Sequence, residues 1–389
     1  MKFAHLADVH IGGWREENLK KLTIDAFSKA MDCCIDKNVG FILISGDLFN
    51  TSLPAIELLK DTAEILQKVR NNDISVYIVP GSHDFSPSGK TMLDVLEKAG
   101  LVENVFKVKD NKLVFTIDKT NTKITGILGR KGALEKYDYL NLNIKDLEKE
   151  SGFKIFMLHT AIEEFKPQEL EKVEALKLQS LPKNFNYYAG GHVHYIFNKK
   201  QDNSIIAYPG ALFPNNFQEL EKFKHGGFYI VDDKLNLEYV NIKLKDVVSY
   251  VIDANDKTPQ EIEKELLNID NFEDKIVTLR IEGILKEGKT SDINFNKIME
   301  HFEEAYFVLK NTNKLCSKEF QELSIEGGDI EDIENKIIQE YLEKNKSLDD
   351  EEKLILDMIN VLNKEKDEGE KNIDFENRII KDFKKIIEI

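Results

Sequence analysis

Short apolar runs alternate with amphipathic stretches through residues 1–240, and this alternation restricts the fold more than any other feature of the sequence. The runs are rich in Val, Ile, Phe and Tyr, as strands are: "KFAHLAD", "VGFILISGD", "SVYIVPG", "TKITGILG", "FKIFMLH", "NYYAGGH", "IIAYPG" and "GFYIVDD". Between the early runs, residues 17–38 and 54–72 space their apolar side chains as helices do. The pattern predicts an α/β core with a largely parallel sheet in its first half, and the closely spaced later strands predict a second sheet.

A smaller pattern follows at residues 246–315. Three strand-like runs alternate there with two amphipathic helical stretches, which predicts a compact α+β module. A break with paired glycines, "SIEGGDIED", then leads into a highly charged helical segment with three apolar stripes. We therefore expect three domains, at residues 1–240, 246–315 and 330–389. A free segment as charged as the last one buries too little apolar surface to hold one shape, so we expect it to bind a partner; a small self-contained helical bundle is the alternative.

The net charge of −16 is unevenly distributed along the chain. Residues 241–389 carry 23 Lys and Arg against 37 Asp and Glu, whereas residues 1–240 carry 31 against 33. The acidity therefore belongs to the C-terminal part, and it does not exclude a polyanionic substrate for the N-terminal part.

The cysteines and the hydropathy indicate the compartment. Cys33 and Cys34 are adjacent and Cys316 is remote, which argues against a disulfide framework or a cysteine-based zinc site. No apolar run is long enough to span a bilayer, and the start "MKFAHLADVH" lacks the order of regions found in signal peptides. We expect a cytoplasmic protein with no membrane partner.

Polar residues of the kind that bind metals stand where the apolar runs end. Five of the eight histidines lie at these ends, together with three aspartates and a serine. In chain order the residues are Asp8, His10, Asp47, Ser82, His83, Asp84, His159, His192 and His194. Imidazoles and carboxylates bind divalent cations, and Asp-x-His or His-x-His spacing puts both side chains on one side of an extended segment. Because ligands of such sheets bind beyond the C-terminal strand ends, the set predicts a metal centre there.

The order D-x-H, G-D, G-x-H-D, H, G-H-x-H resembles the calcineurin-like metallophosphoesterase superfamily over roughly residues 1–240. The resemblance implies a two-sheet sandwich flanked by helices, with two metal ions at its edge. It implies Asp8, His10 and His194 as ligands of the first ion and Asp47 as the carboxylate that bridges both. His159, His192 and Ser82 correspond to ligands of the second ion. His83 corresponds to the histidine near the scissile phosphate, and we expect Asp84 to orient it.

A narrower resemblance appears in the flanking segments "MKFAHLADVHIG", "FILISGDLFNTSLP", "GGHVH" with "YPGAL", and "HGGFYIVD". They resemble the SbcD-type DNA-repair nuclease, the Mre-type subunit of the double-strand-break repair complex. The resemblance implies a double-strand exonuclease and single-strand endonuclease that uses two Mn²⁺, with Mg²⁺ as the alternative ion.

The same family implies the partners. DNA would be bound as double-strand ends, hairpins or single strands, and residues 246–315 would form a DNA-facing cap domain. Residues 330–389 would bind the coiled coil of an SbcC/Rad-fifty-type ATPase. A homodimer would form through the helical stretches at residues 56–69 and 91–102.

Two residues depart from the family pattern and leave alternatives open. The turn motif usually carries Asn where this chain has Ser82, and a neutral hydroxyl is a poorer and shorter ligand than an amide carbonyl. Many members also carry His where this chain has Asn50, which cannot donate a proton as an acid. The first alternative is therefore a DNA-binding scaffold with weakened nuclease. The second is a small-substrate phosphoesterase, which the extra module and the tail disfavour.

Two other residues have a structural and a functional interpretation. Trp14 follows the first motif, and we expect a packing or loop residue there more readily than one that stacks on a base. His5 lies within the first strand pattern, and we expect a packed, hydrogen-bonded histidine.

Overall fold

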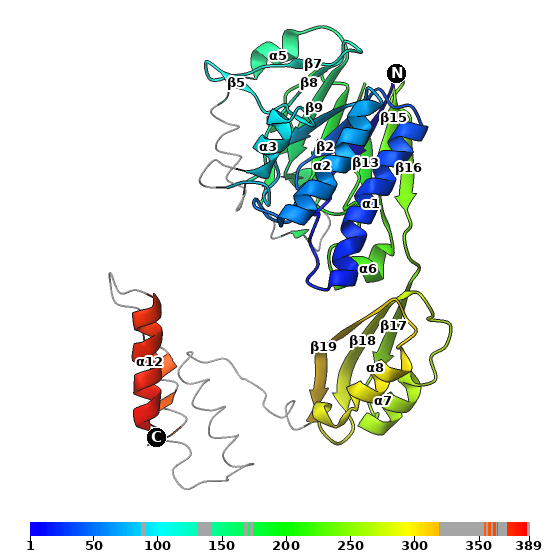
Figure 1. The fold of residues 1–389 in the computed structure, drawn as a ribbon, viewed down its shortest axis with the longest axis vertical. Helices are drawn as coiled ribbons and strands as arrows, with labels where there is room; N and C mark the ends of the chain where they lie inside the picture. The colour runs from blue at the N-terminus through cyan, green and yellow to red at the C-terminus, as the bar shows by residue number, and fades with distance from the viewer. Residues whose placement is uncertain are drawn as a thin grey trace. The chain divides into compact units, whose positions relative to one another are not determined.

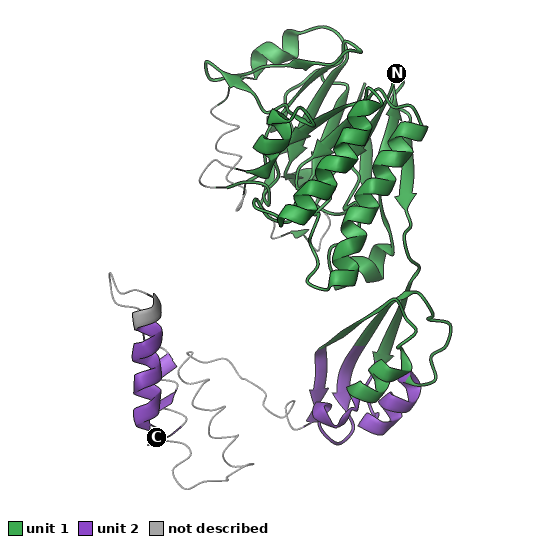
Figure 2. Cartoon of the chain, viewed as in Figure 1, with its two compact units in different colours: residues 1–252, 267–280, 295–312 green, residues 253–266, 281–294, 313–389 purple. Residues whose placement is uncertain are grey.

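The computed structural model describes residues 1–86, 91–130, 144–166, 174–201, 203–318 and 372–386, with isolated positions 142, 170, 171, 354, 357, 358, 361, 362 and 364. The chain forms two compact units (Figure 2). The first comprises Met1–Ile252, Leu267–Arg280 and Phe295–Thr312, and the second comprises Asp253–Leu266, Ile281–Asn294 and Asn313–Ile389. The predicted module at 246–315 is thus shared between the units, and the predicted segment at 330–389 lies mostly outside the described residues.

Two six-stranded sheets build the first unit (Figure 1). The first has the order β16-β15-β1-β2-β3-β4, in which β1 to β4 run parallel and β15 pairs antiparallel with both β1 and β16. Its strands are β1 (Lys2–Leu6), β2 (Phe41–Ser45), β3 (Ser75–Val79), β4 (Glu103–Asn104), β15 (Gly226–Asp232) and β16 (Leu237–Ile242). The predicted parallel sheet of the first half is therefore confirmed.

The second sheet has the order β13-β14-β12-β9-β8-β7, with parallel pairing from β14 to β8 and antiparallel edges. Its strands are β7 (Thr116–Ile117), β8 (Lys123–Gly126), β9 (Lys154–His159), β12 (Tyr187–Gly191), β13 (Phe197–Gln201) and β14 (Ser204–Tyr208). Two short pairs add β5 (Val108–Lys109) with β6 (Lys112–Leu113) and β10 (Ala161–Ile162) with β11 (Ala175–Leu176).

The two sheets pack face to face over a core of aromatic and branched side chains. The members of this core include Phe3, Phe41, Leu43, Tyr77, Ile124, Ile155, Met157, Tyr187 and Tyr229. Phe3 stacks on Phe41 of the neighbouring strand with 5.2 Å between ring centroids. Because strands buried on both faces read as continuous apolar runs, this sandwich explains why the sequence shows runs and not alternation.

Helices cover the outer face of the first sheet. They are α1 (Glu17–Asp36), α2 (Ile56–Asn71), α3 (Met92–Lys98) and α6 (Phe217–Phe223). The buried side of α1 repeats every three or four residues and includes Leu19, Leu22, Ala26 and Ala30, as an amphipathic helix requires. Beyond the second sheet lie α5 (Lys145–Lys149) and the turns η2 (Glu163–Phe165) and η4 (Leu178–Ser180).

The strands and helices predicted within residues 246–315 are all present. The order is β17 (Val247–Asp253), α7 (Pro259–Leu266), β18 (Ile276–Leu285), η5 (Thr290–Asp292), α8 (Phe295–His301) and β19 (Phe307–Ser317). The strands pair in the order β17-β18-β19. Helix α12 (Asn372–Ile386) is described near the C-terminus. None of the described helices combines the length and apolarity needed to cross a bilayer.

Candidate metal centre

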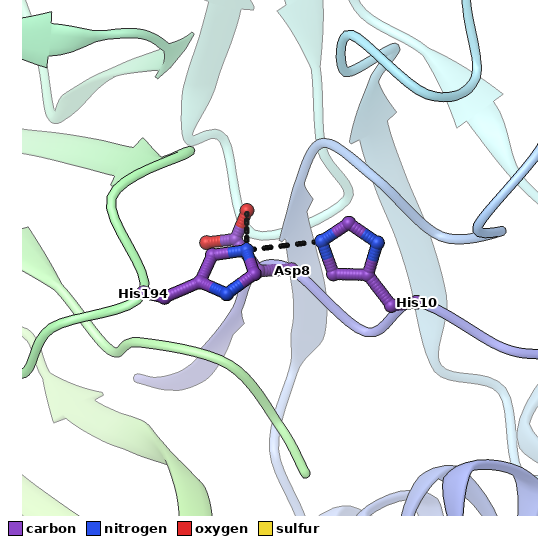
Figure 3. Close-up of side chains that lie close together, drawn as sticks. All are labelled: Asp8, His10 and His194. Atoms are coloured by element: carbon purple, nitrogen blue, oxygen red, sulfur yellow. Dashed lines mark hydrogen bonds and ion pairs between the residues drawn. The ribbon is translucent and has the colours of Figure 1, made fainter. Parts of the chain in front are cut away.

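The sequence-predicted residues converge at one edge of the sandwich, because the parallel strands of both sheets end there. Asp8 and His10 follow β1, Asp47 follows β2, and His159 is the last residue of β9. These four side chains are almost fully buried, each with 1% of the residue exposed. Figure 3 shows Asp8, His10 and His194 pointing toward one another, although His194 comes from the loop after β12 in the other sheet.

The first cluster consists of Asp8, His10 and His194. The Nε2 atoms of His10 and His194 lie 3.0 Å apart, and Nε2 of His194 lies 3.7 Å from Asp8 Oδ1. Burial and the facing His194 ring lower the pKa of His10 to about 3. Burial alone would lower the pKa of His194, but the Asp8 and Glu219 carboxylates raise it to about 9. The proton between the two rings therefore belongs to His194.

Asp47 lies between the first cluster and His159. Its Oδ2 atom is 3.6 Å from His10 Nε2 and 3.1 Å from His159 Nε2. Burial favours the neutral acid, but the His159 and His10 imidazoles hold the pKa of Asp47 well below its usual range. Burial would lower the pKa of His159, yet the Asp47 carboxylate raises it to about 10. One carboxylate thus faces an imidazole on each side.

The donor set fits divalent cations. The ring atom His159 Nε2 is buried, faces Asp47 Oδ2 at 3.1 Å and makes no well-directed hydrogen bond. Among the described residues, three groups bring their ligand atoms within 4.8 Å of one another: Asp8 with His10 and His194, Asp8 with Asp47 and His159, and His10 with Asp47 and His83. Nitrogen and oxygen donors of this kind bind divalent first-row metals and Mg²⁺.

The backbone at the centre is strained. Asp8, His10, Asp47, His192 and His194 all have a positive φ, between 39° and 91°. Left-handed backbone in residues other than glycine costs about 1–3 kcal/mol at each position and collects at functional sites. The strain is therefore concentrated in the loops that carry the proposed ligands.

Gly46 precedes Asp47 with a φ of 87°, a conformation that favours glycine. A Cβ atom on Gly46 would lie 2.0 Å from His159 Nδ1, so this close approach also requires glycine. The chain can therefore pass close to the His159 ring just before Asp47 only because residue 46 has no side chain.

His192 and Ser82 are near the centre but lie outside these three groups. The His192 N–H donates to both Asp8 oxygens, at 2.9 and 3.0 Å, and its ring centroid lies 5.2 Å from that of His159. Burial and His159 lower the pKa of His192 to about 4, which keeps its ring neutral. Ser82 is 7% exposed, and its hydroxyl makes no hydrogen bond to another described residue.

Asp84 does not contact the His83 ring, and the expected pairing of these two residues is corrected. Its carboxylate accepts the N–H groups of Leu48, Phe49 and Gly81, each at 3.1 Å, so it ties the loop after β2 to the loop after β3. Burial and the Asp47 carboxylate raise the pKa of Asp84 to about 6, although the three N–H donors act in the opposite direction.

His83 is oriented by a backbone group instead. Its Nδ1–H donates to the Asn50 carbonyl at 2.8 Å, and its own N–H donates to Asp47 Oδ1 at 2.8 Å. Because a carbonyl only accepts, Nδ1 carries the proton, and the ring has a ligand atom within 4.8 Å of those of His10 and Asp47. Sequence patterns carried no signal for this contact, since any residue at position 50 offers the same carbonyl.

The comparisons with known proteins agree with this geometry. The calcineurin-like phosphoesterase family matches residues 1–195. The chain belongs to this family. Both the predicted superfamily and the two-sheet fold are confirmed by this match.

Relatives of this phosphoesterase resemble it over more of the chain than the matched residues 1–195. The chain is 26% identical over 386 residues to the DNA double-strand break repair protein Mre11 of Archaeoglobus fulgidus, covering 88% of this chain and 85% of the relative. It is 28% identical over 356 residues to the Mre11 protein of Methanocaldococcus jannaschii, covering 88% and 89%. The predicted resemblance to the SbcD/Mre type is thereby confirmed. The solved structure of TT1561 from Thermus thermophilus covers 62% of this chain and 99% of its own, with a TM-score of 0.42 and 16% identity.

Two further residues of this phosphoesterase orient histidines of the centre, although neither belongs to a sequence motif. The Ser45 carbonyl accepts from His159 Nδ1 at 2.8 Å, and Glu219 Oε1 accepts from His194 Nδ1 at 2.9 Å. Both contacts fix a ring so that Nε2 faces the cluster. Glu219 lies 25 residues after His194 in an ordinary helix start, so no spacing rule could have found it.

The expectations for His5 and Trp14 are confirmed. His5 Nδ1 accepts from the Tyr187 hydroxyl at 2.9 Å, and its Nε2–H donates to Ser45 Oγ at 3.1 Å, because that hydroxyl itself donates to the Ala189 carbonyl at 3.0 Å. The network joins the two sheets beneath the centre. Trp14 packs in the core, and its Nε1–H donates to the Pro214 carbonyl at 2.9 Å.

Proposed function

We propose that this phosphoesterase is a metal-dependent DNA nuclease of double-strand-break repair, with double-strand exonuclease and single-strand endonuclease activity. The observation that carries the proposal is the position of Asp47, whose Oδ2 atom faces His10 Nε2 at 3.6 Å and His159 Nε2 at 3.1 Å. A carboxylate between two sets of nitrogen ligands suits a pair of divalent cations. The likeness to the archaeal Mre11 proteins supports DNA as the substrate.

The residues have separate roles in this proposal. Asp8, His10 and His194 would hold one cation, Asp47 would bind both, and the second would be held by His159, His192 and Ser82. When bound, a pair of divalent cations supplies Lewis acidity toward a phosphodiester and a nucleophile from water near neutral pH. We expect Mn²⁺ as the working ion from the family resemblance, with Mg²⁺ as the alternative.

His83 is the proposed catalytic side chain that is not required as a ligand. The Asn50 carbonyl fixes its Nδ1–H, so Nε2 can hold a proton for the leaving oxygen or contact a phosphate oxygen. Asp84 takes the different role of holding the Asp47 and His83 loops together through backbone N–H groups. The position of His83 relative to Asp47 in this proposal therefore depends on the loops after β2 and β3, which Asp84 joins.

The partners follow the family resemblance. We expect the segment at residues 330–389 to bind the coiled coil of an SbcC/Rad-fifty-type ATPase in the cytoplasm, and residues 246–315 to face DNA ends, hairpins or single strands. Within α12, Ile380 is 52% exposed and its neighbours Phe375, Ile379 and Phe383 are partly exposed, which supports a surface that a partner covers. Residues 330–353 of the predicted segment lie outside the described residues.

A homodimer is proposed through the start of α2 and through α3. Leu53, Ile56 and Val95 are 64%, 79% and 50% exposed, respectively. The two regions adjoin, because the Met92 N–H donates to the Ser52 carbonyl at 3.3 Å. Exposed apolar side chains gathered in this way favour a twofold contact.

The test of the nuclease is digestion of end-labelled linear duplex and single-stranded DNA with Mn²⁺. We expect Asp47→Ala and His83→Ala each to lower turnover by at least about 100-fold. Glu238→Gln, at an exposed ion pair with Lys37, is the control and should digest DNA like the wild type. Wild-type turnover in the Asp47→Ala and His83→Ala variants would end the proposal.

A DNA-binding scaffold is the second candidate, because the Ser82 hydroxyl makes no hydrogen bond to the described residues and Asn50 contributes only its carbonyl to His83. Titration with Mn²⁺ separates the two functions. A nuclease should bind two ions and turn DNA over, whereas a scaffold should bind DNA with one ion or none and negligible turnover.

A further inference from the structure

Glu219 holds His194 from the side opposite the metal cluster. Its Oε1 atom accepts from His194 Nδ1 at 2.9 Å, and the carboxylate is only 13% exposed. The carboxylate is itself fixed, because Oε2 accepts the Asn215 N–H at 2.8 Å and Oε1 accepts from Asn216 Nδ2 at 2.6 Å. The Glu219 N–H in turn donates to the Asn216 side chain, which caps α6. The direction of the His194 ring is therefore set by the first turn of α6.

The same helix is also held by strands β17 and β18. Arg280 of β18 donates to both carboxylate oxygens of Glu221, from Nε at 3.0 and 3.2 Å and also from Nη2. Its guanidinium lies 5.1 Å over the ring of Phe217, the first residue of α6. The side chains of Arg280 and Glu221 are 15% and 17% exposed, so this two-pronged ion pair is largely screened from water.

A third contact joins the end of α6 to the same strands. The Lys224 ammonium donates to Ser249 Oγ of β17, and Thr278 Oγ1 of β18 donates to that hydroxyl at 2.7 Å. With Phe217 and Glu221, this contact fixes the beginning, the middle and the end of α6. A helix of seven residues held at three points has little freedom to move independently of β17 and β18.

We propose that Glu219 is a positioning residue for the metal ligand His194, and that Arg280 sets its position through α6. The inference rests on the proposed metal centre and adds a dependence of that centre on a residue in the sheet of β17 and β18. Carboxylates that accept from a ligating imidazole fix its tautomer and orientation, and their loss typically weakens metal affinity 10–100-fold. Arg280 acts through another residue, so we expect its loss to have a smaller effect.

The experiment is calorimetric titration of the full-length protein with Mn²⁺, together with visible absorption of the Co²⁺-loaded protein. Glu219→Ala should weaken the affinity for one of two ions by about 10–100-fold and shift the Co²⁺ spectrum. Glu219→Gln keeps an acceptor oxygen and should recover part of the loss. Arg280→Met should weaken the same ion several-fold, and it should have no additional effect in the Glu219→Ala background. Glu238→Gln, which changes a carboxylate paired with Lys37 away from the centre, is the control and should bind both ions like the wild type.

The outcomes separate this inference from the nuclease itself. If the wild type binds two ions and Glu219→Ala leaves both affinities and the Co²⁺ spectrum unchanged, the positioning role is wrong and the metal centre stands. If Arg280→Met lowers only the thermal stability, or weakens binding equally with and without Glu219, the coupling through α6 is wrong. Wild-type protein that binds no divalent cation would overturn both proposals.

Discussion

The Nε2 atoms of His10 and His194 face each other at 3.0 Å inside the buried cluster. Glu219 engages the opposite nitrogen of His194, so Nε2 of that ring carries the additional proton when the ring is charged. Without a cation, the proton on His194 separates two nitrogens that would otherwise present lone pairs to each other. A divalent cation and protons therefore compete for the same space.

Metal binding should release protons in a pH-dependent manner. The pKa values of His194 and His159 are raised to about 9 and about 10, so both rings are protonated at pH 7 in the metal-free protein. Ligation requires neutral imidazole, and we expect roughly two protons to be released at pH 7. The number should fall, and the apparent affinity should stop rising, as the pH passes 9 to 10.

Calorimetry in buffers of different ionisation enthalpy measures this number. His194→Gln should reduce the release by about one proton, because it removes the group whose pKa lies near 9. The matched variant His301→Gln removes a ring that lies outside the cluster, and it should leave the release unchanged. A binding enthalpy that is the same in every buffer would contradict the competition between cation and protons.

Asp84 should be more important for stability than its neighbour His83. Asp84→Asn keeps one acceptor oxygen and replaces the other by an NH₂ group, which would face either the Phe49 N–H at the Oδ1 position or the Leu48 and Gly81 N–H groups at the Oδ2 position. Leaving buried donors without an acceptor costs about 1–3 kcal/mol for each, so we expect unfolding to be easier by about 3 kcal/mol. Urea denaturation measures the change, and Asp146→Asn at an exposed pair should stay within about 0.5 kcal/mol of the wild type. A wild-type midpoint for Asp84→Asn would contradict this role.

His5 should make stability depend on pH below neutrality. Burial lowers its pKa from the ordinary value of 6.5 to about 3, so the unfolded chain takes up a proton that the folded protein does not. Stability therefore falls as the pH falls from 6.5 toward 3, by about 1.4 kcal/mol for each pH unit from this residue.

The test of this dependence is urea unfolding of His5→Gln between pH 7 and 4. The variant should be less stable at pH 7, because Tyr187 and Ser45 lose their partner, but its stability should decline less steeply with falling pH. His301→Gln is the matched substitution and should keep the wild-type slope. Parallel curves for His5→Gln and the wild type would show that His5 does not titrate in this way.

The parallel sheet and the polar residues at the ends of its strands could be predicted from the sequence, and the reason is physical. Parallel strands have their C-terminal ends at one edge, so polar residues after β1, β2 and β3 lie close together, and the residues that end β9 and follow β12 meet them because the parallel strands of the second sheet end at the same edge of the sandwich. The spacing of Asp8 with His10 is a weak signal by itself, and the whole ordered set of polar residues at the strand ends predicted the site. The elements of residues 246–315 were also predictable, because each is short and regularly patterned.

The supporting contacts were not predictable from the sequence. His83 is oriented by the Asn50 carbonyl, which every residue type possesses, and Asp84 binds backbone N–H groups and not the adjacent ring. Glu219 reaches His194 only because α6 lies against the loop after β12. Contacts to backbone, or between elements brought together by packing, leave no residue spacing to recognise.

Ser82→Asn should strengthen the binding of the second cation. Ser82 lies between Gly81 and His83 at 7% exposure, and its short hydroxyl makes no hydrogen bond to the described residues. An amide carbonyl is a better oxygen ligand and extends further from the backbone, so we expect tighter binding of one ion and faster DNA turnover with Mn²⁺. Calorimetric titration gives the affinity, and Ser82→Ala should show whether the hydroxyl contributes at all. Equal affinities for the serine, alanine and asparagine proteins would mean that position 82 is not a ligand.

The apolar surface at the start of α2 should mediate the homodimer. Ile56 is 79% exposed, and complete burial of a side chain of this size is worth about 1.5–3 kcal/mol. In a twofold contact the substitution acts twice, and Ile56→Asp would place two carboxylates in an apolar interface. We expect this variant to sediment as a monomer at micromolar concentration where the wild type sediments as a dimer. Ile117→Asp changes a residue of similar exposure, 61%, on β7 of the other sheet, and it should leave the dimer intact. A wild-type monomer at that concentration, or an Ile56→Asp dimer of unchanged affinity, would show that this surface has another use.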